Sequence, residues 1–154
     1  MKIDIKPIGI IRNSVEESGK GDDWKTVVSE IIIDKAFEEA LDQIGEFSHI
    51  IVLYWMHQIA PSKRPVLKVH PRKRQDLPLV GVLATRSPAR PNPIGMTTVK
   101  LLECRKNILK VVGLDAMDGS PVIDIKPYIP GHDSPTEAGT PDWITKLKSP
   151  SESK

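Results

Sequence analysis

Arginine, serine and asparagine side chains suited to binding a charged ligand are gathered in one proline-rich stretch, TRSPARPNPIG (residues 85–95). Proline fixes φ at about −65° and keeps the preceding residue out of the helical region. Ser87, Arg90 and Asn92 each precede a proline, so we expect their side chains to project from a stiff, extended frame. A guanidinium always carries its charge and offers several donors to carboxylate, phosphate or ribose oxygens. The alternative is a rigid, solvated loop between two strands.

Three other segments place polar groups in or beside apolar runs. His57 and Gln58 end the apolar run VLYWM, and LDAMDG (residues 114–119) predicts a turn after VVG. Asp124 and Lys126 lie inside the strand-like VIDIKPY. Charges within strands are costly unless they are paired. We therefore expect Asp124 to pair with arginines of the proline-rich stretch; the alternative is that Asp124 and Lys126 share an exposed strand face.

Several common binding and catalytic motifs are absent from the sequence. The Gly19-Lys20 pair has Ser14 where a phosphate-binding P-loop requires its first glycine, and GKGDDW lacks the third glycine of a dinucleotide fingerprint. The histidines show no paired spacing and no Cys-x-x-Cys occurs, so we expect no metal site. No Gly-x-Ser-x-Gly elbow indicates a hydrolase. The single cysteine, Cys104, excludes an internal disulfide and favours a buried thiol in a reducing cytosol.

The composition is typical of a folded protein with one core. The chain has 154 residues, of which 39% are hydrophobic and 27% charged. Charged residues interrupt the apolar N-terminus, so we expect no signal or transit peptide, and no apolar run approaches the roughly 18 residues of a membrane span. We therefore expect a cytoplasmic protein with no membrane partner. A formal charge of only +2 limits any nucleic-acid binding to a local patch.

The apolar periodicity favours strands over helices. β-branched and apolar runs predict strands at residues 3–11 with a break at Pro7, and at 26–34, 48–59, 78–87, 94–106, 107–117 and 120–129. The 48–59 run is almost continuously apolar, which is typical of a strand buried on both faces. Without βαβ alternation, so many strands predict an all-β fold, an antiparallel β-barrel or a twisted sheet, with one or two short helices.

One short helix is expected at residues 35–47. Phe37, Leu41 and Ile44 have helical spacing there, and Gly45 would be the C-terminal stop.

The composition shifts to serine, threonine, proline and charge in residues 132–154. We therefore expect a β-barrel domain at residues 1–131 followed by a mostly flexible C-terminal tail. Trp143, Ile144 and Leu147 could dock as a helical turn or stay flexible.

The basic stretch SKRPVLKVHPRKR (residues 62–74) contains no acidic residue. Its basic residues are Lys63, Arg64, Lys68, Arg72, Lys73 and Arg74. Such a stretch is either a solvated loop or a phosphate-binding patch whose affinity depends steeply on salt.

Long strings of the sequence, ATRSPARPNPIGMTTVKLLE, LDAMDGSPVIDIKPYIP and FSHIIVLYWMHQ, resemble the TsaA-like family, whose best-known members are the TrmO tRNA methyltransferases. The resemblance extends in order from Lys6 to Pro130. It implies a single-sheet β-barrel, a homodimer, and S-adenosylmethionine bound near the subunit interface. Characterised bacterial members methylate N6 of threonylcarbamoyl-adenosine (t6A) at position 37, in the anticodon loop of threonine tRNA.

The resemblance also implies which residues form the site. The cofactor contacts fall on His57, Gln58, Arg86, Met96, Leu114, Asp115, Ala116 and Met117. Arg86 suits the cofactor carboxylate or a ribose oxygen. Backbone groups of residues 114–117 suit the edge of the adenine ring. The apolar walls of the pocket would be Met96, Leu114 and Met117. Contacts to RNA are expected from Arg72, Lys73, Arg74 and Arg90. A homodimer would also cover the apolar strand at residues 50–56.

Methylation of an adenine N6 requires a group that takes up its proton. Asp118 and His57 are the catalytic candidates closest in sequence to the cofactor segments, although Asp118 could be only a turn former.

Two features depart from the family pattern. Where family members have a Pro-Arg-Gln-like segment after the first strand, this chain has GKGDDWKT (residues 19–26), so no contact is carried over there. Bacterial tRNA-modifying members also extend into a further C-terminal domain, whereas this chain stops at residue 154.

Three functions remain open at this point: a methyltransferase acting on tRNA, a methyltransferase acting on a small molecule or protein, and a non-catalytic S-adenosylmethionine-binding regulator.

Overall fold

The computed structural model describes residues 2–15, 23–63 and 65–149, which form two compact units. The first unit contains Met1–His57 and Ile94–Ile129. The second contains Gln58–Pro93 and Pro130–Lys154. Residues 58–93, which lie inside the predicted barrel domain at residues 1–131, thus belong to the second unit.

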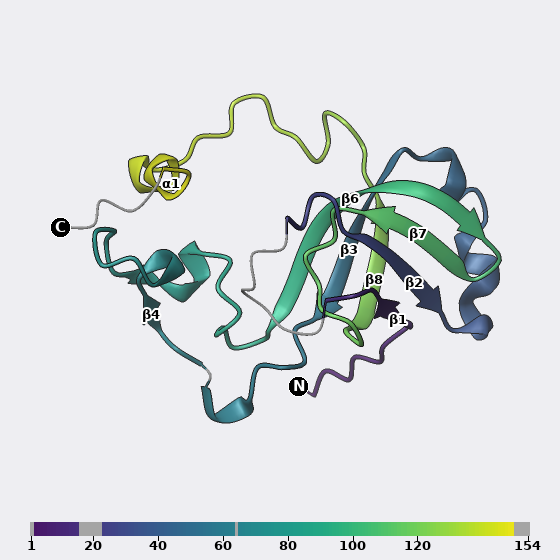
Figure 1. The fold of residues 1–154 in the computed structure, drawn as a ribbon, viewed down its shortest axis with the longest axis horizontal. Coiled ribbons are helices and arrows are strands. Elements are labelled where there is room, and N and C mark those ends of the chain that lie inside the picture. The colour runs from purple at the N-terminus through teal and green to yellow at the C-terminus, as the bar shows by residue number, and fades with distance from the viewer. Residues whose placement is uncertain (1, 16–22, 64, 150–154) are drawn as a thin grey trace. The chain divides into compact units, whose positions relative to one another are not determined.

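A closed, six-stranded antiparallel barrel forms the first unit (Figure 1). Around the barrel the strands are β1 (Gly9–Arg12), β2 (Val28–Ile33), β7 (Ile108–Val112), β6 (Ile94–Arg105), β3 (His49–Trp55) and β8 (Pro121–Pro127). β8 pairs with both β3 and β1, which closes the sheet on itself. The predicted all-β fold with an antiparallel β-barrel is confirmed.

Strand β3 alternates between the barrel interior and its outer side. Ile50, Val52 and Tyr54 are buried, whereas the residues between them are half-buried. Successive side chains of a strand point to opposite faces, so only one face of β3 contributes to the barrel core. The expectation of a strand buried on both faces is therefore wrong for the single chain, in which the outer face of β3 is only half-buried.

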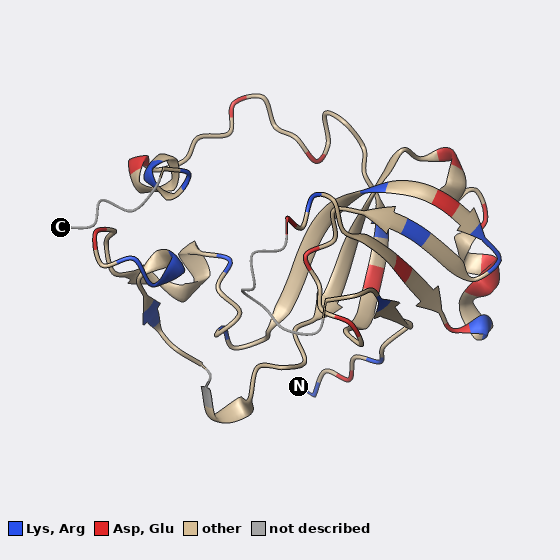
Figure 2. Cartoon of the chain, in the orientation of Figure 1, with Lys and Arg blue, Asp and Glu red and all other residues tan. Residues whose placement is uncertain are grey.

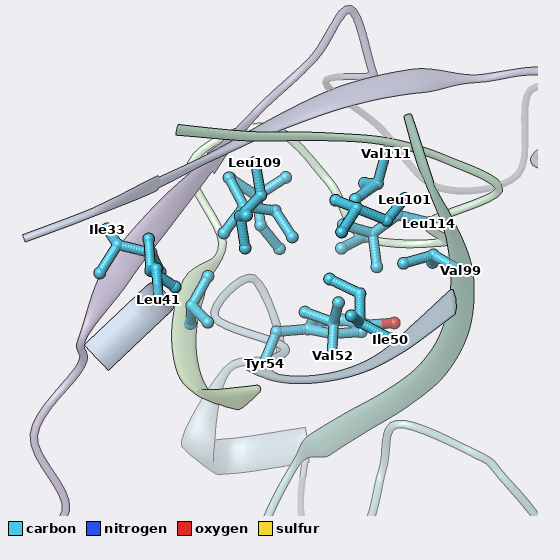
Figure 3. Packing of buried hydrophobic residues seen from close by; sticks show 14 residues of the cluster. Ile33, Leu41, Ile50, Val52, Tyr54, Val99, Leu101, Leu109, Val111 and Leu114 are labelled. Atoms are coloured by element: carbon cyan, nitrogen blue, oxygen red, sulfur yellow. The ribbon is translucent and has the colours of Figure 1, made fainter. Parts of the chain in front are cut away.

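The core fills the inside of the barrel with aliphatic side chains from every strand. Figure 3 shows side chains of β3 pointing across the interior toward those of β6 and β7. The buried cluster contains Ile11, Ile31, Ile33, Leu41, Ile50, Val52, Tyr54, Val99, Leu101, Leu109, Val111, Leu114, Ala116 and Val122. Tyr54 is the member that brings a hydroxyl group to this interior.

Two 3₁₀ segments, η1 (Lys35–Leu41) and η2 (Ile44–Glu46), replace the predicted helix at residues 35–47. Asp34 caps η1 by accepting a hydrogen bond from the Ala36 N–H at 3.0 Å. Gln43 has a φ of 65°, which breaks the helical path between the segments. Gly45 lies inside η2 and does not stop a helix, so that part of the prediction is wrong.

The second unit is built from short elements. A two-stranded sheet pairs β4 (Lys68–Val69) with β5 (Val80–Gly81). The 3₁₀ segments are η3 (Pro61–Lys63), η4 (Pro71–Lys73) and η5 (Val82–Ala84), and the helix is α1 (Asp142–Leu147). The predicted strand at 78–87 is thus reduced to β5. Trp143, Ile144 and Leu147, for which docking and flexibility were both open, lie in α1.

Candidate functional site

The segment that follows β7, residues 114–117, alternates between the barrel core and the surface. Leu114 and Ala116 are buried in the core, with 0% and 1% of their surface exposed. Asp115 is exposed and Met117 is half-buried. This alternation anchors every second residue of the segment, so its backbone lies on the barrel with the intervening residues turned outward. Leu114, predicted as an apolar wall, is therefore part of the core.

Tyr54 and Thr97 hold the segment from the side of β3 and β6. The Tyr54 hydroxyl lies 2.9 Å from the Asp115 carbonyl oxygen and 3.1 Å from its carboxylate Oδ1. The Thr97 hydroxyl donates to the same Oδ1. Burial, and next the nearby Asp115 carboxylate, raise the pKa of Tyr54, so its hydroxyl stays protonated as a donor.

Gly95 leaves the space that the Tyr54 ring occupies. The two residues are cross-strand partners between β3 and β6. A Cβ at position 95 would lie 2.5 Å from Cε2 and 2.7 Å from Cε1 of the ring. Only a glycine leaves room for an aromatic ring this close to the neighbouring backbone. The ring therefore covers Gly95 and carries its hydroxyl toward Asp115.

Asn13 holds the segment from the opposite side. Its side-chain amide Nδ2 donates to the Ala116 carbonyl oxygen at 2.9 Å and to Ser29 Oγ at 3.0 Å. Its backbone N–H donates to Asp118 Oδ1 at 3.0 Å. Asn13 is half-buried, and its side-chain and backbone donors together fix the backbone that they contact.

Asp118, a catalytic candidate, is tied into this same network. Besides the bond from Asn13, its Oδ2 lies 3.3 Å from Arg12 Nη1. Its N–H donates to the Val15 carbonyl oxygen at 2.7 Å. This geometry matches the turn-forming role that the sequence had left as the alternative, because both carboxylate oxygens already accept bonds.

Backbone N–H groups of the segment remain available for a ligand. Within residues 2–15, 23–63 and 65–149, neither the Asp115 nor the Met117 N–H donates to an acceptor. Both residues reach the surface. Donors held on a fixed backbone beside apolar side chains suit the edge of a planar heteroaromatic ring.

His57, predicted both as a cofactor contact and as a catalytic candidate, lies at the end of this region. Its Nδ1 is 3.3 Å from the hydroxyl of Ser120, which is itself buried. A Cβ at Gly119 would lie 3.9 Å from His57 Nε2, and Gly119 has a φ of 76° that favours glycine. The imidazole is exposed, and its contact with Ser120 orients the ring. An exposed and oriented imidazole suits a proton acceptor.

Met96 is the remaining predicted cofactor residue that lies in the barrel. It follows Gly95 and precedes Thr97 on β6, with 49% of its surface exposed. Its thioether side chain offers a polarisable apolar surface. Met96 and Met117 are thus the predicted wall residues that reach the surface.

Gln58, Arg86 and Arg90 lie in the second unit. Gln58 and Arg86 are exposed. Arg90 Nη1 donates to the Thr85 carbonyl oxygen at 3.1 Å and to that of Ser87 at 3.4 Å. Arg90 thus stiffens the proline-rich stretch from within, in addition to the prolines.

Asp124 does not pair with the arginines of the proline-rich stretch. It forms an ion pair with Lys126, Nζ to Oδ2 at 2.8 Å, on β8. Residues two apart on a strand share a face, so the local partner satisfies the carboxylate. The expectation of a long-range ion pair is therefore wrong, and the exposed-face alternative is correct.

Two arginines of the basic stretch contact the end of α1. Arg74 Nη1 donates to the carbonyl oxygens of Lys146 at 3.0 Å and Ser149 at 2.6 Å, and Arg72 donates to that of Leu147 at 3.2 Å. Cations are favourable at helix C-termini. Figure 2 shows Lys and Arg positions, in blue, on β4 and elsewhere in the second unit. Arg64 and residues 19–22 of the GKGDDWKT loop lie outside the described residues.

The described parts of the chain hold no group of three or more His, Cys, Asp or Glu side chains able to bind a metal. No helix among these residues is long and apolar enough to cross a membrane.

Sequence reasoning missed Asn13, Tyr54 and Thr97. A tyrosine inside the apolar run of β3 was the available signal, because a buried hydroxyl needs a partner.

Comparisons with known proteins agree with this fold. The chain is 46% identical over 137 residues to a probable S-adenosyl-L-methionine-binding protein of Methanothermobacter thermautotrophicus, covering 87% of this chain and 96% of that protein. It is 45% identical over 132 residues to an S-adenosyl-L-methionine-binding protein of Archaeoglobus fulgidus, covering 82% and 89%.

A crystal structure of TrmO from Pseudomonas aeruginosa superposes with a TM-score of 0.73 at 30% identity, covering 90% of this chain and 62% of that chain. This chain thus spans about three-fifths of that protein's length. Residues 18–134 match the tRNA-methyltransferase O N-terminal domain. Because that match covers most of its length, the chain belongs to the family of tRNA-methyltransferase O N-terminal domains.

Proposed function

We propose that this protein is an S-adenosylmethionine-dependent methyltransferase that acts on tRNA. The observation that carries the proposal is the 114–117 segment, which is held by Asn13 and Tyr54 and whose Asp115 and Met117 N–H groups have no acceptor among the described residues. These donors match the ring nitrogens of adenine, and Met96 and Met117 offer apolar contact to its faces. The family and the names of two archaeal relatives point to the same ligand.

Gln58 and Arg86 stay predicted contacts to the cofactor. Arg86 carries a permanent charge and a fork of donors, which suits a carboxylate such as that of the methionine part. Arg90 contributes through the stiffness of the proline-rich stretch, because its guanidinium already binds two carbonyl oxygens there.

When bound, S-adenosylmethionine would supply an electrophilic methyl group on its sulfonium. The chain's own task is then to align the acceptor amine, exclude water and accept the proton that leaves the amine as its new bond forms. His57 is the better proton acceptor, because Ser120 orients its ring and the side chain is exposed. Asp118 is less suited, since Arg12 and Asn13 already use its carboxylate.

The proposed substrate atom is N6 of t6A at position 37 in the anticodon loop of threonine tRNA. This choice rests on the family, and on Arg72, Lys73 and Arg74 as predicted phosphate contacts. Lys73 and its two arginine neighbours carry adjacent positive charges, so they suit a curved phosphate backbone.

Incubation with methyl-labelled S-adenosylmethionine and threonine tRNA tests the proposal. Transcripts with and without t6A, followed by digestion to nucleosides, separate the substrates. We expect label in a doubly modified adenosine from the t6A-containing tRNA and in no nucleoside of the unmodified transcript. His57→Ala should abolish methyl transfer even at S-adenosylmethionine concentrations that saturate the variant. Label in another nucleoside would refute the proposed atom.

A second function, non-catalytic S-adenosylmethionine binding, is favoured by one observation. The two archaeal relatives are named for binding alone, and this chain covers 96% and 89% of their lengths. If the protein binds the cofactor but no tRNA accepts label, this function or methylation of a small molecule or protein takes the place of the first. Labelling of a cell extract from which RNA has been removed separates those two.

We further propose that the protein is a cytoplasmic homodimer. The outer side of β3 is half-buried and Met96, beside it on β6, is exposed, so a partner subunit would cover apolar surface. The free Cys104 suits the reducing cytosol. Light scattering at micromolar concentration should give about twice the 17.1 kDa chain mass; a mass near that of one chain would refute the dimer.

A further inference from the structure

We propose that Tyr54 and Thr97 are positioning residues for cofactor binding, and that the Asp115 carboxylate acts through them rather than by touching the cofactor. Their hydroxyl groups would lock the 114–117 backbone in the conformation that presents its N–H groups to adenine. This inference rests on the proposed function, because it concerns how the same site recognises its ligand.

The Asp115 carboxylate is turned toward two hydroxyl groups. Asp115 is an exposed residue, and an exposed carboxylate ordinarily extends into water. Here its Oδ1 is turned back to accept the Thr97 hydroxyl and lies 3.1 Å from the Tyr54 hydroxyl. Hydrogen bonds to an ionised acceptor are stronger than neutral ones, so this orientation is favoured.

Tyr54 binds the backbone of Asp115 as well as its side chain. The hydroxyl oxygen is 2.9 Å from the Asp115 carbonyl oxygen. One hydroxyl group therefore faces both the side chain and the main chain of Asp115, whose N–H has no acceptor among the described residues. Movement of that hydroxyl would rotate the peptide planes of the segment.

Neither the Tyr54 nor the Thr97 hydroxyl can move freely. Tyr54 has 5% of its surface exposed, and its ring is confined against Gly95. Thr97 lies two residues beyond Gly95 on the same inward face of β6, and its β-branched side chain has few rotamers. The positions of both donors are thus set by the register of β3 and β6.

A direct contact of Asp115 with the cofactor is the competing explanation. An aspartate could bind the ammonium group or a ribose hydroxyl of S-adenosylmethionine through its charge. The two explanations require different properties of the side chain at position 115. A positioning role needs an oxygen that accepts two hydroxyl groups, which an asparagine also offers, whereas binding an ammonium group needs the negative charge.

Four variants, Asp115→Asn, Asp115→Ala, Tyr54→Phe and Thr97→Val, separate these explanations by calorimetry with two ligands. S-adenosylmethionine carries the ammonium and carboxylate, whereas 5′-methylthioadenosine keeps the adenosine part without them. We expect Asp115→Ala, Tyr54→Phe and Thr97→Val each to weaken both ligands by the same factor, about threefold to tenfold. Asp115→Asn should stay within about twofold of wild type for both.

Matched controls are Tyr128→Phe and Thr98→Val. Tyr128 contacts His49 at the other end of β3, and Thr98 is the exposed neighbour of Thr97. These variants lose the same atoms and should bind both ligands as the wild type does. Thermal unfolding of every variant gives its folded fraction. If Tyr54→Phe does not fold, Thr97→Val and the two Asp115 variants still test the inference.

Three results would overturn the inference. Equal binding by wild type, Tyr54→Phe and Thr97→Val would show that the hydroxyl groups position nothing. A loss in Asp115→Asn as large as in Asp115→Ala, confined to S-adenosylmethionine, would show direct contact with the ammonium group. Binding of neither ligand by the wild type would refute the proposed function itself, and the inference with it.

Discussion

The Tyr54 ring lies directly over Gly95, its cross-strand partner on β6, and fills the space that any side chain at position 95 would take. This pair joins the barrel core to the candidate site. The ring belongs to the buried cluster, whereas its hydroxyl bonds to Asp115 in the candidate cofactor segment, residues 114–117. Packing in the core and the shape of the site are therefore coupled through one side chain.

Gly95→Ala should destabilise the barrel because the new methyl group would overlap the Tyr54 ring. Overpacking of this kind costs about 1–3 kcal/mol. Gly81→Ala is the matched control: its Cβ would meet no atom within 4 Å, and Gly81 has an ordinary φ of −59°. Urea unfolding of both variants measures the difference. Equal stability of Gly95→Ala and wild type would contradict the close contact.

Tyr54 should make the stability of the protein depend on alkaline pH. Burial, and next the Asp115 carboxylate, raise its pKa above the ordinary value of 10.0. Stabilisation from a raised pKa is fully present below the unfolded-state value and is lost as the pH rises from there toward the folded-state value. The free energy of unfolding should thus fall above about pH 10 in the wild type, and less steeply in Tyr54→Phe.

The control for this prediction is Tyr128→Phe, which should keep the wild-type slope. Urea unfolding at a series of pH values from about 8 to 11 gives the three curves. Parallel curves for wild type and Tyr54→Phe would mean that Tyr54 titrates alike in the folded and unfolded chain.

Arg86→Ala should weaken S-adenosylmethionine binding by about 2 kcal/mol, through loss of a charge-assisted hydrogen bond. 5′-Methylthioadenosine, which lacks the carboxylate, should bind both proteins alike if Arg86 contacts that group. Arg105→Ala removes an exposed arginine from the far end of β6 and is the control. Calorimetry with unchanged affinity for S-adenosylmethionine would remove Arg86 from the site.

Replacement of Arg72, Lys73 and Arg74 by alanine should flatten the salt dependence of tRNA binding and lower methyl transfer, with cofactor affinity unchanged. Each lost phosphate contact should reduce the slope of log K against log salt concentration by about 0.7–0.9. The control variant replaces Lys100, Arg105 and Lys110, exposed residues of the barrel strands, and removes the same charge.

A second comparison separates RNA contact from the docking of α1. Arg72 and Arg74 bind carbonyl oxygens at the end of α1, whereas no such bond from Lys73 occurs among the described residues. Lys73→Ala alone should therefore lower the salt slope without loosening α1, which limited proteolysis near residue 140 would detect. An unchanged slope in both the single and the triple variant would mean that the stretch is a solvated loop.

Local sequence information was sufficient for the strands and for the family. β-branched runs indicate β2, β3, β6, β7 and β8 because such residues suit a pleated, half-buried surface. The strings around Arg86 and Asp118 indicate the family, and the match over residues 18–134 bears this out. Prolines fix backbone angles within a few residues, so the stiffness of residues 85–93 could also be predicted.

Asp124 shows where the sequence was misleading. Its partner is Lys126, two residues away on the same face of β8, and a long-range ion pair was wrongly preferred. The helix at residues 35–47 was misplaced for a similar reason, since spacing alone does not reveal the left-handed turn at Gln43. Local alternatives of similar energy cannot be ranked by residue type alone.

The sequence by itself indicated the barrel strands and the family to which the chain belongs. Only the tertiary structure decided which polar groups meet: Tyr54 reaches Asp115 across 61 positions, and Asn13 reaches Asp118 across 105. These contacts depend on the order of strands around the closed barrel and on their register. Strand order and register result from many weak interactions between residues that are distant in the sequence. A one-residue shift of β3 against β6 would turn Tyr54 away from Gly95 and leave the 114–117 segment without its hydroxyl support.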